Sequence, residues 1–401
     1  MYQKLKNIFK LDLKQKLIYK EKMLRDLMSS TRFSALMDTP EDLKTQNLIY
    51  HAVNKKPDIA FDSQSALWNE KRINIIERLQ LAYKKSSSDY KEIDKNNDLW
   101  TEITDTNLKA LIDAIENMSP ENLSRFMLNF GSKFTWFGGI TTSIDGYTQD
   151  KREYYIALTY FDMLVSVAEY LGVIPNENPE SYKNMQNIQI GIDEIIEKIN
   201  QELKISIEIN PNIIHTDGVK TQNGLIHYRH ILGLYGAIRI KELSSTDAPC
   251  CEIGGGLGFT AYYCSKMGVK GFHLYDLPIT NFLSGHFLMN ALGTDAVTLY
   301  GEKAGETKIK IYPYWDFFKT KQLYDITINQ DSLNEIDHKT IQFYIDAIPK
   351  RTKKYFLSIN HETYHPKTVH NLLSKNKNFK KVAKSRFWLR KGYIEELFKI
   401  R

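Results

Sequence analysis

Short apolar runs alternate with helical patterns in the last two-fifths of the chain. Runs that begin at Pro249 and Phe272 are each followed by a segment with helical spacing. Further strand-like runs occur at 297–300, 308–312, 324–328 and 355–359, with a helical pattern at 339–348. Strands that alternate with helices form parallel sheets covered on both faces. The pattern predicts an α/β fold, a Rossmann-like doubly wound sheet, for residues 236–401.

The chain before residue 236 has mainly helical patterns. They cover residues 40–53, 65–83, 107–118, 120–130, 152–171 and 187–203, and the polar run 84–98 is typical of a linker. We therefore expect a helical N-terminal extension over residues 1–98 and a helical substrate-binding or cap region over residues 99–235. Glycines, hydroxyls and aromatic rings mix at 130–148, which suits either a loop that presents rings to a sugar or a tight structural turn.

Composition is consistent with a cytoplasmic enzyme. The chain has 401 residues, no apolar run of the length that spans a membrane, and an N-terminus too charged for a secretory signal. Its three cysteines, Cys250, Cys251 and Cys264, form no C-x-x-C pair, so we expect buried reduced thiols.

The net charge of +6 is concentrated at the two ends. Residues 1–28 hold eight Lys or Arg against three acids, and residues 350–401 hold fifteen against three. The C-terminal excess could attract an anionic substrate, such as a nucleotide- or lipid-phosphate-linked sugar, or could be a solvated surface. The amphipathic pattern of residues 1–28 suits either weak contact with the inner face of an anionic membrane or docking on the rest of the protein. The number of subunits is left open.

A glycine-rich turn follows the first strand of the predicted sheet. Gly254, Gly256 and Gly258 come directly after an apolar run, and Glu252 precedes them by two residues. Backbone N–H groups at such a turn point at a bound ligand. Asp276 ends the next strand, where a carboxylate can bind two ribose hydroxyls. Together these residues predict a nucleoside site.

The glycine spacing resembles that of class I S-adenosylmethionine (SAM) methyltransferases. A dinucleotide fingerprint has its third glycine where this chain has Phe259, whereas the acidic-x-Gly-x-Gly-x-Gly pattern matches that family. The resemblance implies SAM as cofactor. Mg²⁺ could assist, but no residue pattern indicates it. The resemblance implies further cofactor contacts from residues outside the glycine turn, namely Asp276, Leu277, Trp315, Asp316 and Asn329. It also implies that Arg229 could meet either the methionine carboxylate of SAM or an acidic substrate.

Two histidine patterns could hold a metal. His227 and His230 are i, i+3 neighbours without an adjacent carboxylate, and His361 to His365 is a literal H-E-x-x-H. Zinc proteases need that motif on one helical face. Here a strand precedes it and Pro366 follows it, so we predict no metal site.

Three residues are candidates for the general base. Asp331 and Glu335 follow the strand 324–328, and His361 follows the strand 355–359. Ligands bind at the carboxyl ends of strands in doubly wound sheets, and an imidazole exchanges protons near neutral pH. We expect His361 to accept the proton, with Asp331 orienting it or acting alone.

A narrower resemblance, from about residue 100 to the end, is to bacterial sugar O-methyltransferases. The segments that carry it are L-G-V-I-P-N-E-N-P-E, E-I-G-G-G-L-G, D-L-P and N-Q-D-S-L-N-E. This resemblance implies methyl transfer to a hydroxyl on a sugar of a surface glycan or its precursor. Two alternatives stay open, a nucleic-acid or other small-molecule methyltransferase and a catalytically inactive SAM-binding partner in a glycan assembly complex. N-Q-D-S replaces the [DN]-P-P-[YFW] of amino methyltransferases, so nucleic acid is not the expected substrate.

Overall fold

The computed structural model describes residues 61–64, 66–90, 99–106, 108–129, 153–175, 190–210, 212–213, 216–303, 305, 307–362, 368–390 and 392–401. The patterns at 1–28 and 40–53, the aromatic loop at 130–148 and Asn176–Glu180 lie outside these ranges. None of the described helices is both long enough and apolar enough to cross a membrane.

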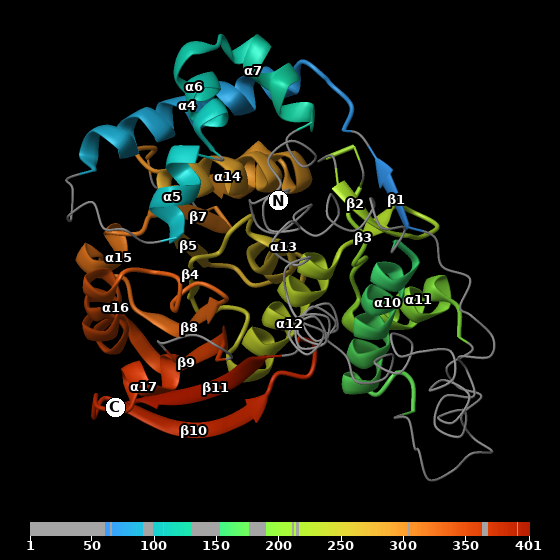
Figure 1. Cartoon of the computed structure of the whole chain (residues 1–401), viewed down its shortest axis with the longest axis vertical. Helices are drawn as coiled ribbons and strands as arrows, with labels where there is room; N and C mark the ends of the chain where they lie inside the picture. Colours follow the sequence, from blue (N-terminus) through green and yellow to red (C-terminus); the bar gives the residue numbers. More distant parts are fainter. Residues whose placement is uncertain are drawn as a thin grey trace, which may run out of the picture.

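An eight-stranded sheet forms the centre of the described C-terminal half (Figure 1). Its strand order is β10-β11-β9-β8-β4-β5-β7-β6. The strands are β4 (Cys250–Ile253), β5 (Phe272–Asp276), β6 (Val297–Thr298), β7 (Ile309–Pro313), β8 (Tyr324–Gln330), β9 (Thr352–His361), β10 (Phe379–Arg386) and β11 (Tyr393–Ile400). Strands β4 to β9 are parallel, and β11 is antiparallel to both β9 and β10. The order β7-β5-β4-β8-β9 is that of a doubly wound sheet, so the predicted fold is confirmed.

Side chains of strand β4 alternate between two separate cores. In β4, Cys250 lies in the core beneath α12 (Tyr228–Leu243), α13 (Phe259–Lys266) and α14 (Pro278–Leu292). Cys251 and Ile253 lie in the core beneath α15 (Asp316–Lys319), α16 (His338–Arg351) and α17 (Val369–Leu373). Because strand side chains have a period of two, Glu252 is on the α12–α14 face with Cys250.

Capping residues fix where several helices begin. The Asp337 carboxylate accepts hydrogen bonds from the backbone N–H groups of Lys339 and Thr340, the first turn of α16. Pro278 occupies the first position of α14, where a missing N–H costs nothing. The sequence D-L-P therefore ends a strand and starts a helix within three residues.

Helix α4 (Lys71–Asp89) packs on α14, with α6 (Lys109–Asn117) and α7 (Pro120–Phe126) above it (Figure 1). The Tyr83 ring meets the Phe282 ring edge-on, at 6.4 Å between centroids. Arg78 donates to both carboxylate oxygens of Glu302, at 2.7 and 2.8 Å. The predicted linker at 84–98 is wrong as far as Asp89, because α4 continues that far before α5 (Leu99–Thr106).

A small antiparallel sheet lies beside α10 (Glu153–Tyr170) and α11 (Ile192–Leu203) (Figure 1). Its strands are β1 (Phe61–Gln64), β2 (Thr216–Lys220) and β3 (Leu225–Ile226). The sequence patterns did not predict this sheet, because its strands are short and β1 pairs with a segment about 150 residues away.

Helix α12 joins the N-terminal helices to the sheet. A Cβ placed on Gly233 would lie 2.5 Å from Cβ of Phe259, and one on Gly236 would lie 2.6 Å from Nε2 of Gln330. These glycines therefore let α12 pack directly on the start of α13. One apolar core runs from Ile75 through α10–α12 to the sheet, so the described core does not divide at residues 98 or 235. Those domain limits stay a prediction about sequence organisation.

Candidate active site

The glycine turn between β4 and α13 has three residues with left-handed backbone. Gly254, Gly256 and Gly258 have φ of 69°, 56° and 83°. The Gly254 N–H donates to the Tyr275 carbonyl at 2.8 Å, and the Gly258 N–H to the Gly255 carbonyl at 2.9 Å. These bonds hold the turn in a shape that side-chain-bearing residues seldom adopt.

The three glycines face different surroundings. A Cβ on Gly254 would lie 2.1 Å from Oγ of Ser332, and one on Gly258 would lie 2.9 Å from Cδ1 of Leu288. A Cβ on Gly256 would have no described heavy atom within 4 Å. The turn is thus packed at both ends and open in its middle.

Asp276 ends β5 beside the open part of the turn, as the sequence predicts. Its carboxylate accepts hydrogen bonds from the N–H of Gly256 at 2.9 Å and from the N–H of Leu277 at 2.7 Å. Burial raises the pKa of this carboxyl to about 6. Both partners are neutral, so this carboxylate has no bonded cation among the residues that the structure describes.

Glu252 lies beneath the turn with only 2% of its surface exposed. Its Oε1 accepts from the Thr260 hydroxyl at 3.0 Å and from Nε2 of Gln330 at 3.3 Å. Its Oε2 is buried and has no hydrogen-bond partner among the described residues. Burial raises the pKa of Glu252 to about 7.

Trp315 and Asp316 follow β7, the strand that pairs with β5. The Trp315 ring is buried against Tyr314 and Tyr90, at 5.1 and 5.3 Å between centroids. Asp316 starts α15, and burial raises the pKa of its carboxyl. The indole packs the loop, and its predicted stacking on adenine stays a prediction, as do the predicted cofactor contacts of Asp316 and Leu277.

Asn329 does not fit its predicted role as a cofactor ligand. It is fully buried, and its Nδ2 donates to the Ile253 carbonyl at 2.8 Å and to the Ser332 hydroxyl at 2.5 Å. Its Oδ1 accepts from Nδ2 of Asn360 at 2.8 Å. Asn329 therefore ties the ends of β4, β8 and β9 together, which corrects the sequence-based prediction.

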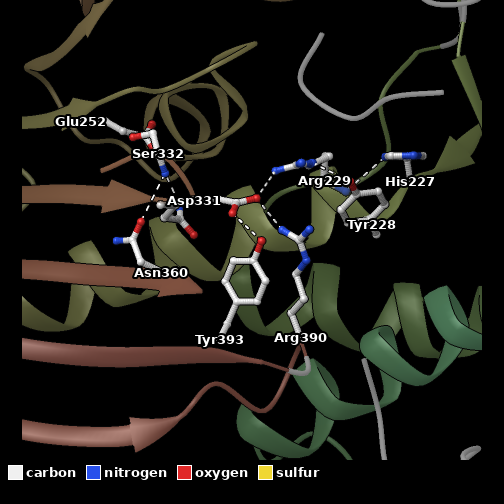
Figure 2. A network of polar contacts seen from close by, with 10 residues as sticks. His227, Tyr228, Arg229, Glu252, Asp331, Ser332, Asn360, Arg390 and Tyr393 are labelled. Carbon is white, nitrogen blue, oxygen red and sulfur yellow. Dashed lines mark hydrogen bonds and ion pairs between the residues drawn. The ribbon is translucent and has the colours of Figure 1, made fainter. Parts of the chain in front are cut away.

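Asp331 sits at the centre of a polar network at the end of β8 (Figure 2). Its Oδ2 accepts from Nη1 of Arg390 at 2.5 Å and from Nη1 of Arg229 at 3.2 Å, and its Oδ1 accepts from the Tyr393 hydroxyl. Burial alone would raise the pKa of Asp331, but Arg390 and Arg229 outweigh it and hold the pKa below its usual value.

The backbone of Asp331 is also unusual. Its φ of 55° is in the left-handed region, where residues with a side chain seldom occur. Such strain persists where surrounding contacts fix it, and it concentrates at functional sites. The bonds from two arginines and a tyrosine favour a positioning role for Asp331 over that of a proton acceptor.

The other two base candidates lie at the same sheet edge. His361 is the last residue of β9, is partly exposed, and its ring meets the Tyr393 ring at 5.5 Å between centroids. Glu335 is in the loop after β8, where its N–H donates to the Ser332 carbonyl at 3.0 Å. Their roles in proton transfer stay predictions.

The two histidine patterns have local structural roles or lie partly outside the described residues. His227 caps α12, with its Nδ1 accepting from the Arg229 N–H at 3.2 Å, and Nδ1 of His230 accepts from the His227 N–H at 3.3 Å. Burial lowers the pKa of His230 to about 3. His361 belongs to a strand, and His365 lies outside the described residues. Across the described ranges, no three His, Cys, Asp or Glu side chains are grouped so that they could hold a metal ion.

Sequence reasoning missed Arg390, Tyr393 and Asn360. Arg390 and Tyr393 belong to the hairpin of β10 and β11, which reaches the site because β11 pairs antiparallel with β9 and places Tyr393 opposite His361. In the sequence, Arg390 is one of fifteen basic residues at 350–401, and no local pattern distinguishes it from the others. Asn360 directly precedes His361, but a strand-end amide has no distinct spacing.

No known family model matches this chain, and no curated protein matches it either. Solved structures similar to it include the glycopeptide N-methyltransferase MtfA complexed with S-adenosyl-L-homocysteine (SAH), at 10% identity, TM-score 0.34, 42% of this chain and 90% of that one. The mitomycin 7-O-methyltransferase MmcR is similar at 16% identity and TM-score 0.31, and the match covers 43% of this chain and 56% of that one. The magnesium protoporphyrin IX methyltransferase ChlM from Synechocystis PCC 6803 with bound SAH is similar at 11% identity and TM-score 0.32. That match covers 44% of this chain and 89% of that one. These likenesses are partial and concern the fold.

Proposed function

We propose that this protein is a SAM-dependent O-methyltransferase that acts on a hydroxyl of a sugar in a bacterial surface glycan or its precursor. One observation carries the proposal: the open middle of the glycine turn and the carboxylate that ends the next strand meet at one point, with the Gly256 N–H 2.9 Å from Asp276. This is the arrangement that a nucleoside site needs.

The chemistry of this corner suits SAM better than a dinucleotide. Glu252 and Asp276 are two carboxyls whose described hydrogen-bond donors are neutral: a hydroxyl, a side-chain amide and two backbone N–H groups. A pyrophosphate would add negative charge beside them, whereas SAM carries an ammonium and a sulfonium. The residues present therefore fit SAM.

We expect the residues at the ends of β8 and β9 to bind the acceptor hydroxyl. Bound SAM provides a methyl group on a sulfonium that a hydroxyl oxygen can attack. The chain's own task is to hold that oxygen and to accept its proton. His361 is our candidate for the proton acceptor, and a positioned base contributes about 10²–10⁴-fold to such reactions. The sugar assignment rests on the resemblance of D-L-P and N-Q-D-S-L-N-E to sugar O-methyltransferases.

Calorimetry with SAM, SAH and NAD tests the cofactor. We expect SAM and SAH to bind and NAD not to bind. Asp276→Ala should weaken SAM binding by about 1.5–3 kcal/mol, because charge-assisted hydrogen bonds to the ribose are lost. Tight binding of NAD with none of SAM would overturn the proposal.

Incubation with labelled SAM and separated pools of glycans, nucleotide sugars and nucleic acids tests the acceptor. We expect label in a carbohydrate pool. Label in nucleic acid would instead support the alternative of a nucleic-acid methyltransferase. SAM binding without transfer to any pool would support an inactive SAM-binding partner.

A further inference from the structure

Two arginines share a single carboxylate at the end of β8. Arg229 and Arg390, which we call the arginine pair, both donate to Oδ2 of Asp331, at 3.2 and 2.5 Å. The cluster therefore carries one positive charge in excess. The side chains of the arginine pair are 24% and 27% exposed, so a solute can reach them.

Glu395, on β11, and Glu362, just after β9, form no described ion pair with the arginine pair and contact other cations. Glu395 accepts from Nε of Arg239 at 3.1 Å and from the Tyr235 hydroxyl at 2.5 Å. Glu362 pairs with Lys384 at 3.2 Å.

Aromatic rings hold the arginine pair in place (Figure 2). The Arg229 guanidinium lies 5.0 Å from the centroid of Tyr228, and that of Arg390 lies 5.7 Å from Tyr228 and 4.1 Å from Tyr393. The hydrogen bonds of the pair to described residues use Nε and Nη1 of Arg229 and Nη1 of Arg390. Both Nη2 groups are therefore donors with no bond to a described residue, fixed before any ligand arrives.

The arginine pair lies next to the proposed cofactor site. Ser332 follows Asp331 directly, and its Oγ lies 2.1 Å from the position that a Cβ on Gly254 of the glycine turn would take. Arg229 is also the second residue of α12, which packs on α13 at the turn. A group bound by the pair would thus lie beside the methyl donor.

We propose that the arginine pair binds an anionic group of the acceptor, a carboxylate or a phosphate close to the hydroxyl that is methylated. This inference rests on the proposed function and narrows its substrate class to acidic or phosphorylated sugars. Guanidinium groups bind both anions through two parallel N–H bonds, so the chemistry does not separate the two sources.

Calorimetric titration of the full-length, SAH-loaded protein tests the inference. The probes are glucuronate, glucose 1-phosphate and neutral glucose. We expect at least one charged sugar to bind about 10-fold or more tightly than glucose, because its anion gains charge-assisted hydrogen bonds. Whichever of the two charged sugars binds more tightly shows whether the arginine pair prefers a carboxylate or a phosphate. Equal binding of all three, or no charged sugar bound at about 20 mM, a concentration at which even weak millimolar sites fill, would overturn the inference.

Substitutions separate binding from folding. Arg390→Gln should lower the affinity for the charged sugar by about 10-fold or more, while the affinity for SAH stays unchanged. Lys380→Gln is the control, because it removes the same charge from an exposed position on β10. It should change neither the affinity for the charged sugar nor the affinity for SAH. If Arg390→Gln fails to fold, Arg390→Lys keeps the charge and should still weaken binding, because lysine lacks the paired donors.

Asp331→Asn provides a test of opposite sign. It removes the competing carboxylate from the arginine pair, so the charged sugar should bind about 3-fold or more tightly. If the contacts between Asp331 and the arginine pair only stabilise the fold, both Arg390→Gln and Asp331→Asn should weaken binding of the charged sugar. That result would overturn the inference. Failure of SAH to bind would count against the proposed function, and the same titrations on the cofactor-free protein would still test the arginine pair.

Discussion

Asp276 and Asp331 occupy corresponding places at the ends of β5 and β8 but have opposite surroundings. Around Asp276 the described donors are backbone N–H groups, and burial raises the pKa of the carboxyl to about 6. Around Asp331 they are two guanidiniums and a phenol, and the arginines hold the pKa below its usual value. Backbone groups therefore determine the surroundings of Asp276, which we call the glycine-turn side. Side chains that are distant in the sequence determine the surroundings of Asp331, which we call the arginine side.

This difference indicates what each side can receive. The glycine-turn side has carboxyls in need of a positive or hydroxyl-bearing ligand, which matches the ammonium, sulfonium and ribose of SAM. The arginine side has excess positive charge, which matches an anionic acceptor. The following predictions test this contrast, beginning with the largest expected effect.

Gly254→Ala should damage the glycine-turn side most. The new methyl group would combine left-handed backbone with a contact near 2.1 Å to Oγ of Ser332. We expect the free energy of unfolding to fall by about 3–5 kcal/mol, with loss of SAM binding. Urea denaturation and SAH calorimetry measure both effects.

Gly268→Ala is the matched control for that substitution. Gly268 has φ of 87°, but a Cβ there would meet no described atom within 4 Å. Gly268→Ala should therefore lower the free energy of unfolding by only about 1 kcal/mol, through backbone strain alone. Equal losses for the two variants would show that the contact with Ser332 does not matter.

His361→Ala should affect turnover without affecting the cofactor. We expect kcat to fall about 10²-fold while SAH affinity stays nearly unchanged, because a proton acceptor acts mainly in the transition state. His370, which contacts Glu396 instead, provides the control substitution His370→Ala. Full turnover in His361→Ala would move the search for the base to Glu335.

The sequence predicted the glycine-turn side better than the arginine side. Gly254, Gly256, Gly258 and Asp276 lie within one strand-helix-strand unit, so short-range spacing was sufficient to bring them together. Asp331 and Arg390 are 59 residues apart, and they meet only because β11 inserts between β9 and β10. No local pattern specifies that pairing. The error at Asn329 has the same origin, because its partners Ile253 and Asn360 lie on the two neighbouring strands.

Glu252→Gln should stabilise the cofactor-free protein above neutral pH. Burial raises the pKa of Glu252 to about 7, so its ionised form is unfavourable in the folded state. The folded state therefore binds more protons than the unfolded state between about pH 4.5 and 7, and this carboxyl lowers stability as pH rises through that window. We expect a gain of about 1–3 kcal/mol at pH 8 and almost none at low pH, by denaturation at each pH.

Glu395→Gln should have the opposite effect. Glu395 pairs with Arg239 and Tyr235, so neutralising it removes one of the two carboxylates that the Arg239 guanidinium contacts, the other being that of Glu242. A loss of stability from this variant, beside a gain from Glu252→Gln, would sharpen the contrast between unpaired and paired carboxyls. Losses from both would contradict it.

SAM affinity should depend on pH through Asp276. The ribose hydroxyls need the ionised carboxylate as acceptor, and burial raises the pKa of Asp276 to about 6 in the cofactor-free protein. Above that pH the carboxylate is ionised and affinity should be constant. Below it, each molecule of SAM must displace a proton, so affinity should fall by up to about tenfold per pH unit until the pKa of the complex is reached. SAH calorimetry between pH 8 and pH 5 measures this, and Asp276→Asn should give weaker binding with a flatter profile. A wild-type affinity that stays constant to pH 5 would mean that Asp276 is not the ribose acceptor, because its proton would not compete with the ligand.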